Sequence, residues 1–195
     1  MKVYECESKT EAVNFALKKL DRLARLKKFA ATKMGMTPDE VRNAVDPDYD
    51  VLSLRVVEER PLMENVVLVD SCVFIGLLRE GRDPITELTQ RIPLDQLATC
   101  GMVRLEVIRG LSQPKARRIL EEFMDVMLYG TTDNRLWEQA TELAWKLGRT
   151  GVTLPLGDII IATCAHRLGA AVLTYDKHFL SIPGIKVFGS LEELS

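Results

Sequence analysis

The sequence predicts an α/β protein in which helices flank an open parallel β-sheet, with a helical and extended N-terminal arm in front of it. After residue 65, short apolar runs alternate with helical segments, which is the pattern of parallel strands joined by right-handed crossovers. Residues 66–69 are the clearest run, because Val-Val-Leu-Val suits a strand buried on both faces of a sheet. This run ends on Asp70, and open parallel sheets bind ligands where their strands end.

The composition describes a globular chain. Its 195 residues suffice for one substantial domain plus an appendage, and 47% of them are hydrophobic and 28% charged. We expect no membrane span and no signal peptide, because no apolar run approaches the ~20 residues that a spanning helix needs. The four cysteines are far apart and only two histidines are present, which argues against a zinc cluster. We therefore expect buried, reduced thiols and a cytoplasmic protein.

The N-terminal third predicts two helices. A capping-box pattern at residues 8–11 opens a long helix that ends at Gly35, and a second one at residues 37–40 opens a short helix that ends at Asp46. One face of the long helix is an apolar stripe of Val13, Ala16, Leu17, Leu20, Leu23 and Ala24. The other face carries Lys18, Lys19, Arg22, Arg25, Lys27 and Lys28. A solvated face is the first interpretation of these charges, and a surface for nucleic acid or a partner is the second.

Residues 46–64 differ in character from what precedes them. They are acidic, with scattered apolar residues and two arginines, Arg55 and Arg60, and they lack the regularity to bury a core of their own. Residues 9–33 are mostly basic, whereas residues 39–59 are mostly acidic. We therefore predict a boundary near Met63, with an arm at residues 1–62 and the α/β domain at residues 63–195.

The α/β domain is predicted to alternate strands and helices in order. After the strand at 66–69 and its helix, the predicted helices are 83–91, 104–110, 114–127, 132–148 and an almost wholly apolar one up to Gly169. The further predicted strands are 97–103, 127–129, 171–175 and 185–188.

Four acids fall at equivalent places in this pattern. Asp70 ends the first predicted strand and Asp176 the fourth, while Glu106 and Asp158 lie in the first turns of two predicted helices. Each acid alone could cap a helix or a turn. Together, four carboxylates at one sheet edge repel one another unless divalent cations neutralise them, and their hard oxygen atoms suit Mg²⁺ or Mn²⁺. Such a site hydrolyses phosphodiester bonds.

These segments resemble a PIN domain, specifically VapC-type toxins of prokaryotic toxin–antitoxin pairs. The matching stretches are VVLVDSCVFI, MVRLEVIRG, LPLGDIIIA and VLTYDKHF, in the family's order across residues 65–190. The resemblance assigns the family's acidic metal-binding and catalytic cluster to Asp70, Glu106, Asp158 and Asp176. It gives Ser71 an auxiliary role, a hydroxyl that can bond a metal-bound water. His178 departs from the family, where an acid is common at that position, and is expected to weaken a second metal site.

The resemblance also implies a function and partners. A VapC-type toxin is a Mg²⁺- or Mn²⁺-dependent endoribonuclease that cleaves structured RNA such as tRNA, and it forms a homodimer or a higher homo-oligomer.

The N-terminal arm is similar to a VapB-type antitoxin. SKTEAVNFALKKLDRL resembles the second helix of a ribbon-helix-helix antitoxin, and DPDYDVLSLR resembles the segment that covers the toxin's cleft. The resemblance places an inhibitory arginine on Arg55, with Arg60 second, since a guanidinium can bind carboxylates and displace a metal. The chain thus resembles an antitoxin remnant joined to its toxin, with inhibition in cis or in trans. Seven residues before Ser8 leave no room for a DNA-reading strand and first helix, so DNA binding is not expected.

Two alternatives remain open. In the first, the chain is a catalytically silenced PIN-fold module that binds RNA or protein, with its acidic cleft permanently occupied by the arm. In the second, it is a phosphatase or receiver-type domain built around Asp70. The second alternative lacks expected residues, because Cys72 stands where a phosphatase has a second Asp and Tyr175 and Asp176 stand where a receiver has a lysine.

Overall fold

The structure, a computed structural model, describes residues 9–32, 34–44 and 66–194. Its centre is a five-stranded, wholly parallel sheet with the strand order β3-β2-β1-β4-β5. The strands are β1 (Val67–Val69), β2 (Leu97–Cys100), β3 (Leu128–Gly130), β4 (Ala171–Leu173) and β5 (Val187–Phe188). The predicted fold class, an open parallel sheet flanked by helices, is confirmed.

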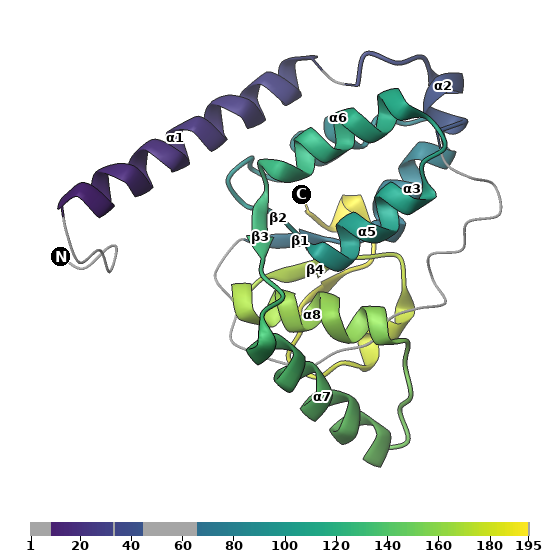
Figure 1. Ribbon diagram of the computed structural model, residues 1–195. Helices are drawn as coiled ribbons and strands as arrows, with labels where there is room; N and C mark the ends of the chain where they lie inside the picture. Colours follow the sequence, from purple (N-terminus) through teal and green to yellow (C-terminus); the bar gives the residue numbers. More distant parts are fainter. Residues whose placement is uncertain (1–8, 33, 45–65, 195) are drawn as a thin grey trace.

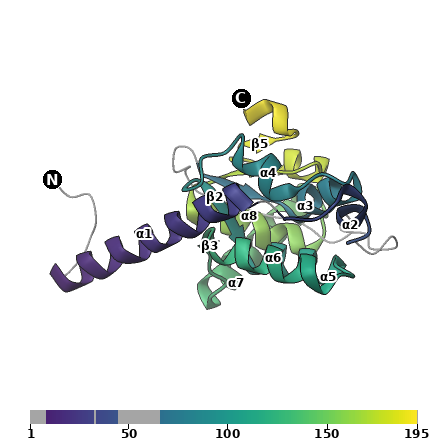
Figure 2. The ribbon, with the colours of Figure 1, turned by 90° about the horizontal axis from the view of Figure 1, so that it is seen from above.

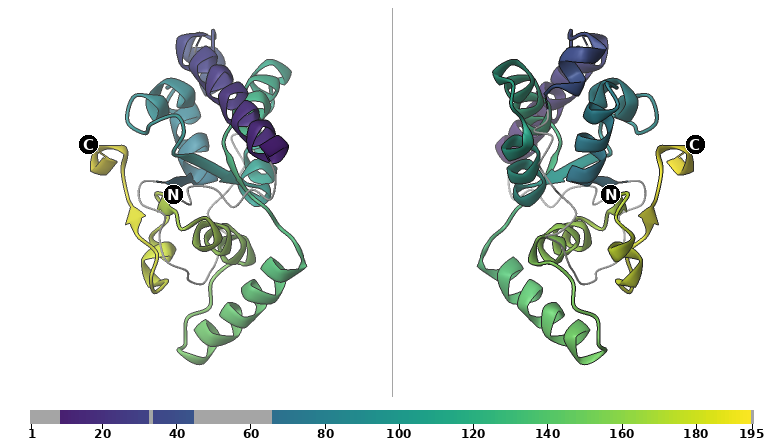
Figure 3. Two further views of the ribbon diagram at one scale, coloured as in Figure 1. Left: turned by 90° about the vertical axis from the view of Figure 1, so that its left-hand side faces the viewer. Right: turned by 90° about the vertical axis from the view of Figure 1, so that its right-hand side faces the viewer.

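Helices cover both faces of the sheet. The chain passes from β1 to β2 through α3 (Ser71–Arg79) and α4 (Pro84–Thr89), and on to β3 through α5 (Gly101–Gly110) and α6 (Pro114–Asp125). It returns to β4, on the other side of β1, through α7 (Asn134–Arg149) and α8 (Leu156–Leu168). Because crossovers are right-handed, the reversed direction moves the helices to the opposite face. Figures 1 and 3 show α3 and α6 on one side of the sheet and α7 and α8 on the other.

Several strands are shorter than predicted. The strand expected at residues 97–103 ends at Cys100, because Gly101 already begins α5. The buried residues of this helix lie at Val103, Glu106, Val107 and Gly110, which is the spacing of one helical face. The strand expected at residues 171–175 ends at Leu173, and the last one is reduced to Val187–Phe188. Two 3₁₀ turns, η2 (Lys177–Ser181) and η3 (Leu191–Leu194), complete the C-terminal part.

Helix α8 packs tightly on the sheet. Its residues from Gly157 to His166 are all buried, and Gly169 ends it in the left-handed conformation (φ 59°). A Cβ atom on Gly130 of β3 would lie 2.9 Å from the Cβ of Cys164, so only glycine allows this approach. The contact fixes the position of α8 and, with it, the first-turn residue Asp158.

The segment from 34 to 44 also packs on the α/β domain. It contains α2 (Pro38–Arg42), which begins with the predicted capping box: the Thr37 backbone N donates to Glu40 Oε2 (2.8 Å), and the Glu40 backbone N donates to Thr37 Oγ1 (3.3 Å). The helix ends at Arg42, earlier than the expected Asp46. Met34, Val41 and Ala44 are buried in the same core as the sheet.

The long N-terminal helix, α1 (Lys9–Thr32), behaves differently. Its N-terminal half projects away from the rest of the molecule (Figure 2). Val13, Leu17 and Leu20 of its apolar stripe are 57%, 57% and 62% exposed. None of the helices in the described ranges is both long and apolar enough to cross a membrane.

Arg22 corrects the prediction of a wholly solvated basic face. Its side chain is partly buried and donates hydrogen bonds to three backbone carbonyl groups, those of Leu94 (3.4 Å), Leu97 (3.2 Å) and Val126. One member of the basic face is thus a structural anchor rather than a solvated charge.

The thiol prediction is confirmed for the three cysteines that the structure describes. Cys72, Cys100 and Cys164 are all buried, and none of these three thiols forms a disulfide within the described residues. Cys6 lies outside the described residues, as do Arg55, Arg60 and the rest of residues 45–65. The domain boundary near Met63 stays a prediction.

Candidate active site

The four predicted acids lie at the carboxyl ends of three adjacent strands. Asp70 follows β1, Glu106 belongs to the helix after β2, and Asp176 follows β4. Asp158 joins them from the first turn of α8. All four side chains are buried, at 0–7% exposure. Two details differ from the prediction: Glu106 lies in the second turn of its helix, since α5 begins at Gly101, and Asp176 stands three residues beyond the end of β4.

Asp70 is held by side-chain donors from α3 and from the residue after β4 rather than by the backbone N–H groups of α3. Although it occupies the N-cap position of α3, its carboxylate makes no capping hydrogen bond to that helix, which is described in full. Instead, the Thr174 hydroxyl and the Cys72 thiol both donate to Asp70 Oδ2, over 2.6 Å and 2.7 Å. Two donors on one oxygen fix the plane of the carboxylate. The simple alternative, that Asp70 is a capping residue, therefore lacks support.

Thr174 connects Asp70 with the loop that carries Asp176. Its hydroxyl oxygen accepts a hydrogen bond from the Asp176 backbone N (3.0 Å), and the Cys72 sulfur accepts one from the Tyr175 backbone N (3.2 Å). The Tyr175 ring also lies over α3, because a Cβ atom on Gly76 would be 3.2 Å from its Cε2 atom. Burial raises the pKa of the Tyr175 phenol above its ordinary value. These contacts hold the β4–η2 loop against the start of α3.

Ser71 and Glu106 form a second pair. The Ser71 hydroxyl donates to Glu106 Oε2 over 2.8 Å, and both side chains are buried. The predicted auxiliary role of Ser71, bonding a metal-bound water, stays a prediction. What the geometry adds is that this hydroxyl orients one of the four acids.

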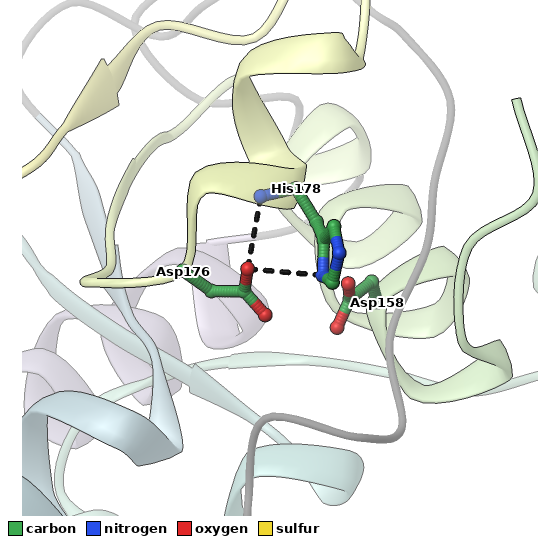
Figure 4. Close-up of side chains that lie close together, drawn as sticks. All are labelled: Asp158, Asp176 and His178. Carbon is green, nitrogen blue, oxygen red and sulfur yellow. Dashed lines mark hydrogen bonds and ion pairs between the residues drawn. The ribbon is translucent and has the colours of Figure 1, made fainter.

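The tightest group of ligand atoms is formed by Asp158, Asp176 and His178. One ligand atom from each side chain lies within 4.8 Å of the others. Figure 4 shows the three side chains pointing toward one another from α8 and from the β4–η2 loop. Asp176 Oδ1 accepts a hydrogen bond from the His178 backbone N (2.9 Å) and lies 3.1 Å from Nδ1 of the His178 ring.

These residues fit a divalent cation. The Asp176 Oδ2 atom is buried and accepts no hydrogen bond from any group in the described part of the chain. A buried carboxylate oxygen without a donor is costly unless a cation binds there. The nearby Asp158 is fully buried as well, so the site concentrates negative charge away from water.

Sequence reasoning missed two residues of this site. Thr174 lies two positions before Asp176 and His178 two positions after it, so both were within the stretch VLTYDKHF. His178 was expected only to weaken a second metal site, whereas its ring lies beside Asp158 and Asp176. The short turn η2 was not predicted, and this turn brings position 178 back over position 176.

Comparisons with known proteins agree with this architecture. Similar folds occur in a chain of VapBC-1 from nontypeable Haemophilus influenzae (20% identity, TM-score 0.52) and in one of the DNA-bound VapBC from Salmonella typhimurium (21% identity, TM-score 0.50). In both cases the match covers 63% of this chain and 96% of the other. No match was found among curated proteins. The model of the PIN domain family matches residues 67–185, and this chain therefore belongs to the PIN domain family.

Proposed function

We propose that this protein is an endoribonuclease that depends on Mg²⁺ or Mn²⁺ and is restrained by its own N-terminal antitoxin-like segment. The observation that supports the proposal is that all four predicted acids are buried, with Asp70, Glu106 and Asp176 following three adjacent strands and Asp158 beside Asp176. PIN domains are generally nucleases and typically use divalent metals. The phosphodiester backbone of RNA is the substrate class for such a site.

The residues that would hold the cation are Asp70, Glu106, Asp158 and Asp176. A bound divalent ion supplies positive charge that activates water and stabilises the developing charge on the phosphate. The chain itself supplies orientation: Thr174 and Cys72 fix Asp70, and Ser71 fixes Glu106. Because these acids are preorganised in a buried setting, little rearrangement is needed when the reaction occurs.

The restraint is assigned to residues 1–62, and within them to Arg55 first and Arg60 second. A guanidinium that reaches the acidic cluster can bind carboxylates bidentately and compete with the cation. The similar structures are named as VapBC pairs, which supports a toxin-type domain that works with an antitoxin. We further propose that residues 63–195 form the nuclease domain and that tRNA is among its substrates. The N-terminal segment would inhibit this domain in cis or in trans, and the protein would form a homodimer or a larger homo-oligomer.

Full-length chains are the right material for the test, because Met34, Val41 and Ala44 belong to the core of the α/β domain. Labelled structured RNA, tRNA included, is incubated with Mg²⁺ or Mn²⁺ and the purified protein. We expect Arg55→Ala with Arg60→Ala to cleave faster than the unmodified chain. Adding Asp70→Asn or Asp158→Asn to that double variant should abolish cleavage while leaving the fold intact, which circular dichroism checks.

A matched control and two opposing outcomes complete the design. Glu138→Gln removes an exposed acid on α7 and should leave cleavage intact. If the arginine double variant neither binds a divalent cation nor cuts RNA, the nuclease assignment is wrong and the silenced binding module is favoured. If the unmodified chain cleaves RNA and the arginine double variant cleaves it at the same rate, the nuclease assignment stands. The inhibitory role of Arg55 and Arg60 is then wrong.

A further inference from the structure

We propose that His178 is a direct ligand of the cation, together with Asp158 and Asp176, and that its imidazole moves the preference of the site from Mg²⁺ toward transition-metal ions such as Mn²⁺ and Co²⁺. This inference rests on the acidic site of the proposed function. To that acidic site, the inference adds a nitrogen ligand and a selectivity among metal ions.

The first support is the spacing of the three side chains. Ligand atoms that bind one ion at about 2.0–2.4 Å can be at most about 4.8 Å apart. The ligand atoms of Asp158, Asp176 and His178 all lie within 4.8 Å of one another. A single ion can therefore contact all three after only small side-chain movements.

The second support is how His178 is held. Asp176 caps the turn η2 by accepting a hydrogen bond from the His178 backbone N–H, which fixes the histidine close to Asp176. The same carboxylate oxygen lies 3.1 Å from the ring atom Nδ1. Asp158 approaches from the buried helix α8 on the other side of the ring (Figure 4). Two separate elements thus present three ligands toward a common point.

The third support is the contrast in burial within the group. Asp158 and Asp176 are buried, whereas the His178 side chain is 51% exposed and lies on the solvent side. The buried oxygen Oδ2 of Asp176, which accepts no hydrogen bond from described groups, marks the side on which positive charge is missing. A cation between the two acids and the ring would satisfy this oxygen and would be enclosed by the imidazole.

The chemistry of the ligands then sets the selectivity. Mg²⁺ prefers oxygen atoms alone, in an octahedral shell that keeps several waters. Imidazole nitrogen binds first-row transition metals more strongly, in the order Mn²⁺ below Co²⁺ below Ni²⁺. A site of two carboxylates and one imidazole is therefore expected to bind Co²⁺ and Mn²⁺ more tightly than Mg²⁺.

The test measures metal binding rather than cleavage. Full-length protein carrying Arg55→Ala and Arg60→Ala is titrated with Mg²⁺, Mn²⁺ and Co²⁺ by calorimetry, and the Mn²⁺ complex is examined for ¹⁴N coupling by electron spin-echo spectroscopy. We expect ¹⁴N coupling from one imidazole, and its loss in His178→Ala. The same change should lower Co²⁺ affinity by about tenfold or more and Mg²⁺ affinity far less.

Two further variants sharpen the result. His178→Asp replaces the imidazole by a carboxylate and should reverse the preference by raising Mg²⁺ affinity relative to Co²⁺. Lys177→Ala changes the exposed neighbour on η2 and should leave every affinity unchanged. Binding of cations without ¹⁴N coupling, with affinities unaffected by His178→Ala, would overturn this inference while leaving the nuclease proposal standing. Absence of any cation binding would overturn both.

Discussion

Helices α1 and α8 differ in how much of their apolar surface is buried against the rest of the molecule. Helix α8 is buried almost throughout, and its apolar residues fill the space between the sheet and α7. Helix α1 leaves Val13, Leu17 and Leu20 more than half exposed. Its contacts with the body include the carbonyl hydrogen bonds of Arg22 and an edge-to-face contact of Phe29 with Phe123 of α6, with ring centroids 5.8 Å apart.

The difference separates the part of the molecule that carries the site from the part that is attached to it. Asp158 belongs to α8, so its position is stabilised by hydrophobic burial, which is the largest favourable term in folding. The attachment of α1 includes the hydrogen bonds of Arg22, each worth about 0.5–1.5 kcal/mol in net terms, beside the packing of Phe29. We infer that α1 can change its position without disturbing the acidic cluster.

The largest expected effect tests hydrophobic burial in the two helices. Ile161 of α8 is fully buried, so Ile161→Ala should lower the free energy of unfolding by about 2–5 kcal/mol. Leu20→Ala in α1 removes a side chain that is 62% exposed and should change it by less than about 0.5 kcal/mol. Urea denaturation of both variants measures the contrast. If both variants lose the same free energy of unfolding, the apolar stripe on α1 must be buried by another surface in solution.

A smaller effect is expected from the polar anchor of α1. Arg22→Ala removes three hydrogen bonds to carbonyl groups and should reduce the local stability of α1 by about 1–3 kcal/mol. Hydrogen exchange should become faster along α1 but stay unchanged in β1 and α8. Arg25→Ala is the matched control, since Arg25 is exposed and pairs only with Asp21 among the interactions found in the described residues. Unchanged exchange in Arg22→Ala would show that other contacts, such as that of Phe29 with Phe123, hold the helix.

The smallest effect concerns the ion pair on the outer edge of α8. Arg167 of α8 donates to both carboxylate oxygens of Asp133, the N-cap of α7, over 2.6 Å and 2.8 Å. These bonds, together with the one from the Leu136 backbone N, lower the pKa of Asp133 to about 2. An unfolded Asp has a pKa of about 3.9, so the contribution to stability is complete above this value and is lost as the pH falls through 2.

The measurement compares Asp133→Asn with the unmodified chain. Asparagine keeps the helix cap but removes the charge, so the unmodified chain should melt slightly higher at pH 6. The difference should shrink as the pH falls from 4 to 2. Because Asp133 is exposed, the expected shift is small, and a difference independent of pH would exclude the ion pair as its cause.

Local features of this fold were predictable from the sequence because they depend on near neighbours. The capping box of Thr37 and Glu40 formed as predicted, through hydrogen bonds across three residues, and the cap at Asp133 is a hydrogen bond of the same short span. The burial of β1 and α8 could be predicted from the apolar composition of their sequences alone. The positions of Asp70 directly after β1 and of Asp158 in the first turn of α8 followed from the same patterns, whereas β4 ends three residues before Asp176.

Only the tertiary structure decided what these residues contact. The strand order β3-β2-β1-β4-β5 brings the ends of β1 and β4 together, so that Thr174 reaches Asp70 across 104 positions of sequence. Arg22 became an anchor because carbonyl groups from three distant loop and strand positions meet beside α1. His178 joined the acids because the turn η2 folds back on Asp176. Periodicity and caps are local properties of the chain, whereas a site is made by long-range packing, which no short stretch of sequence encodes.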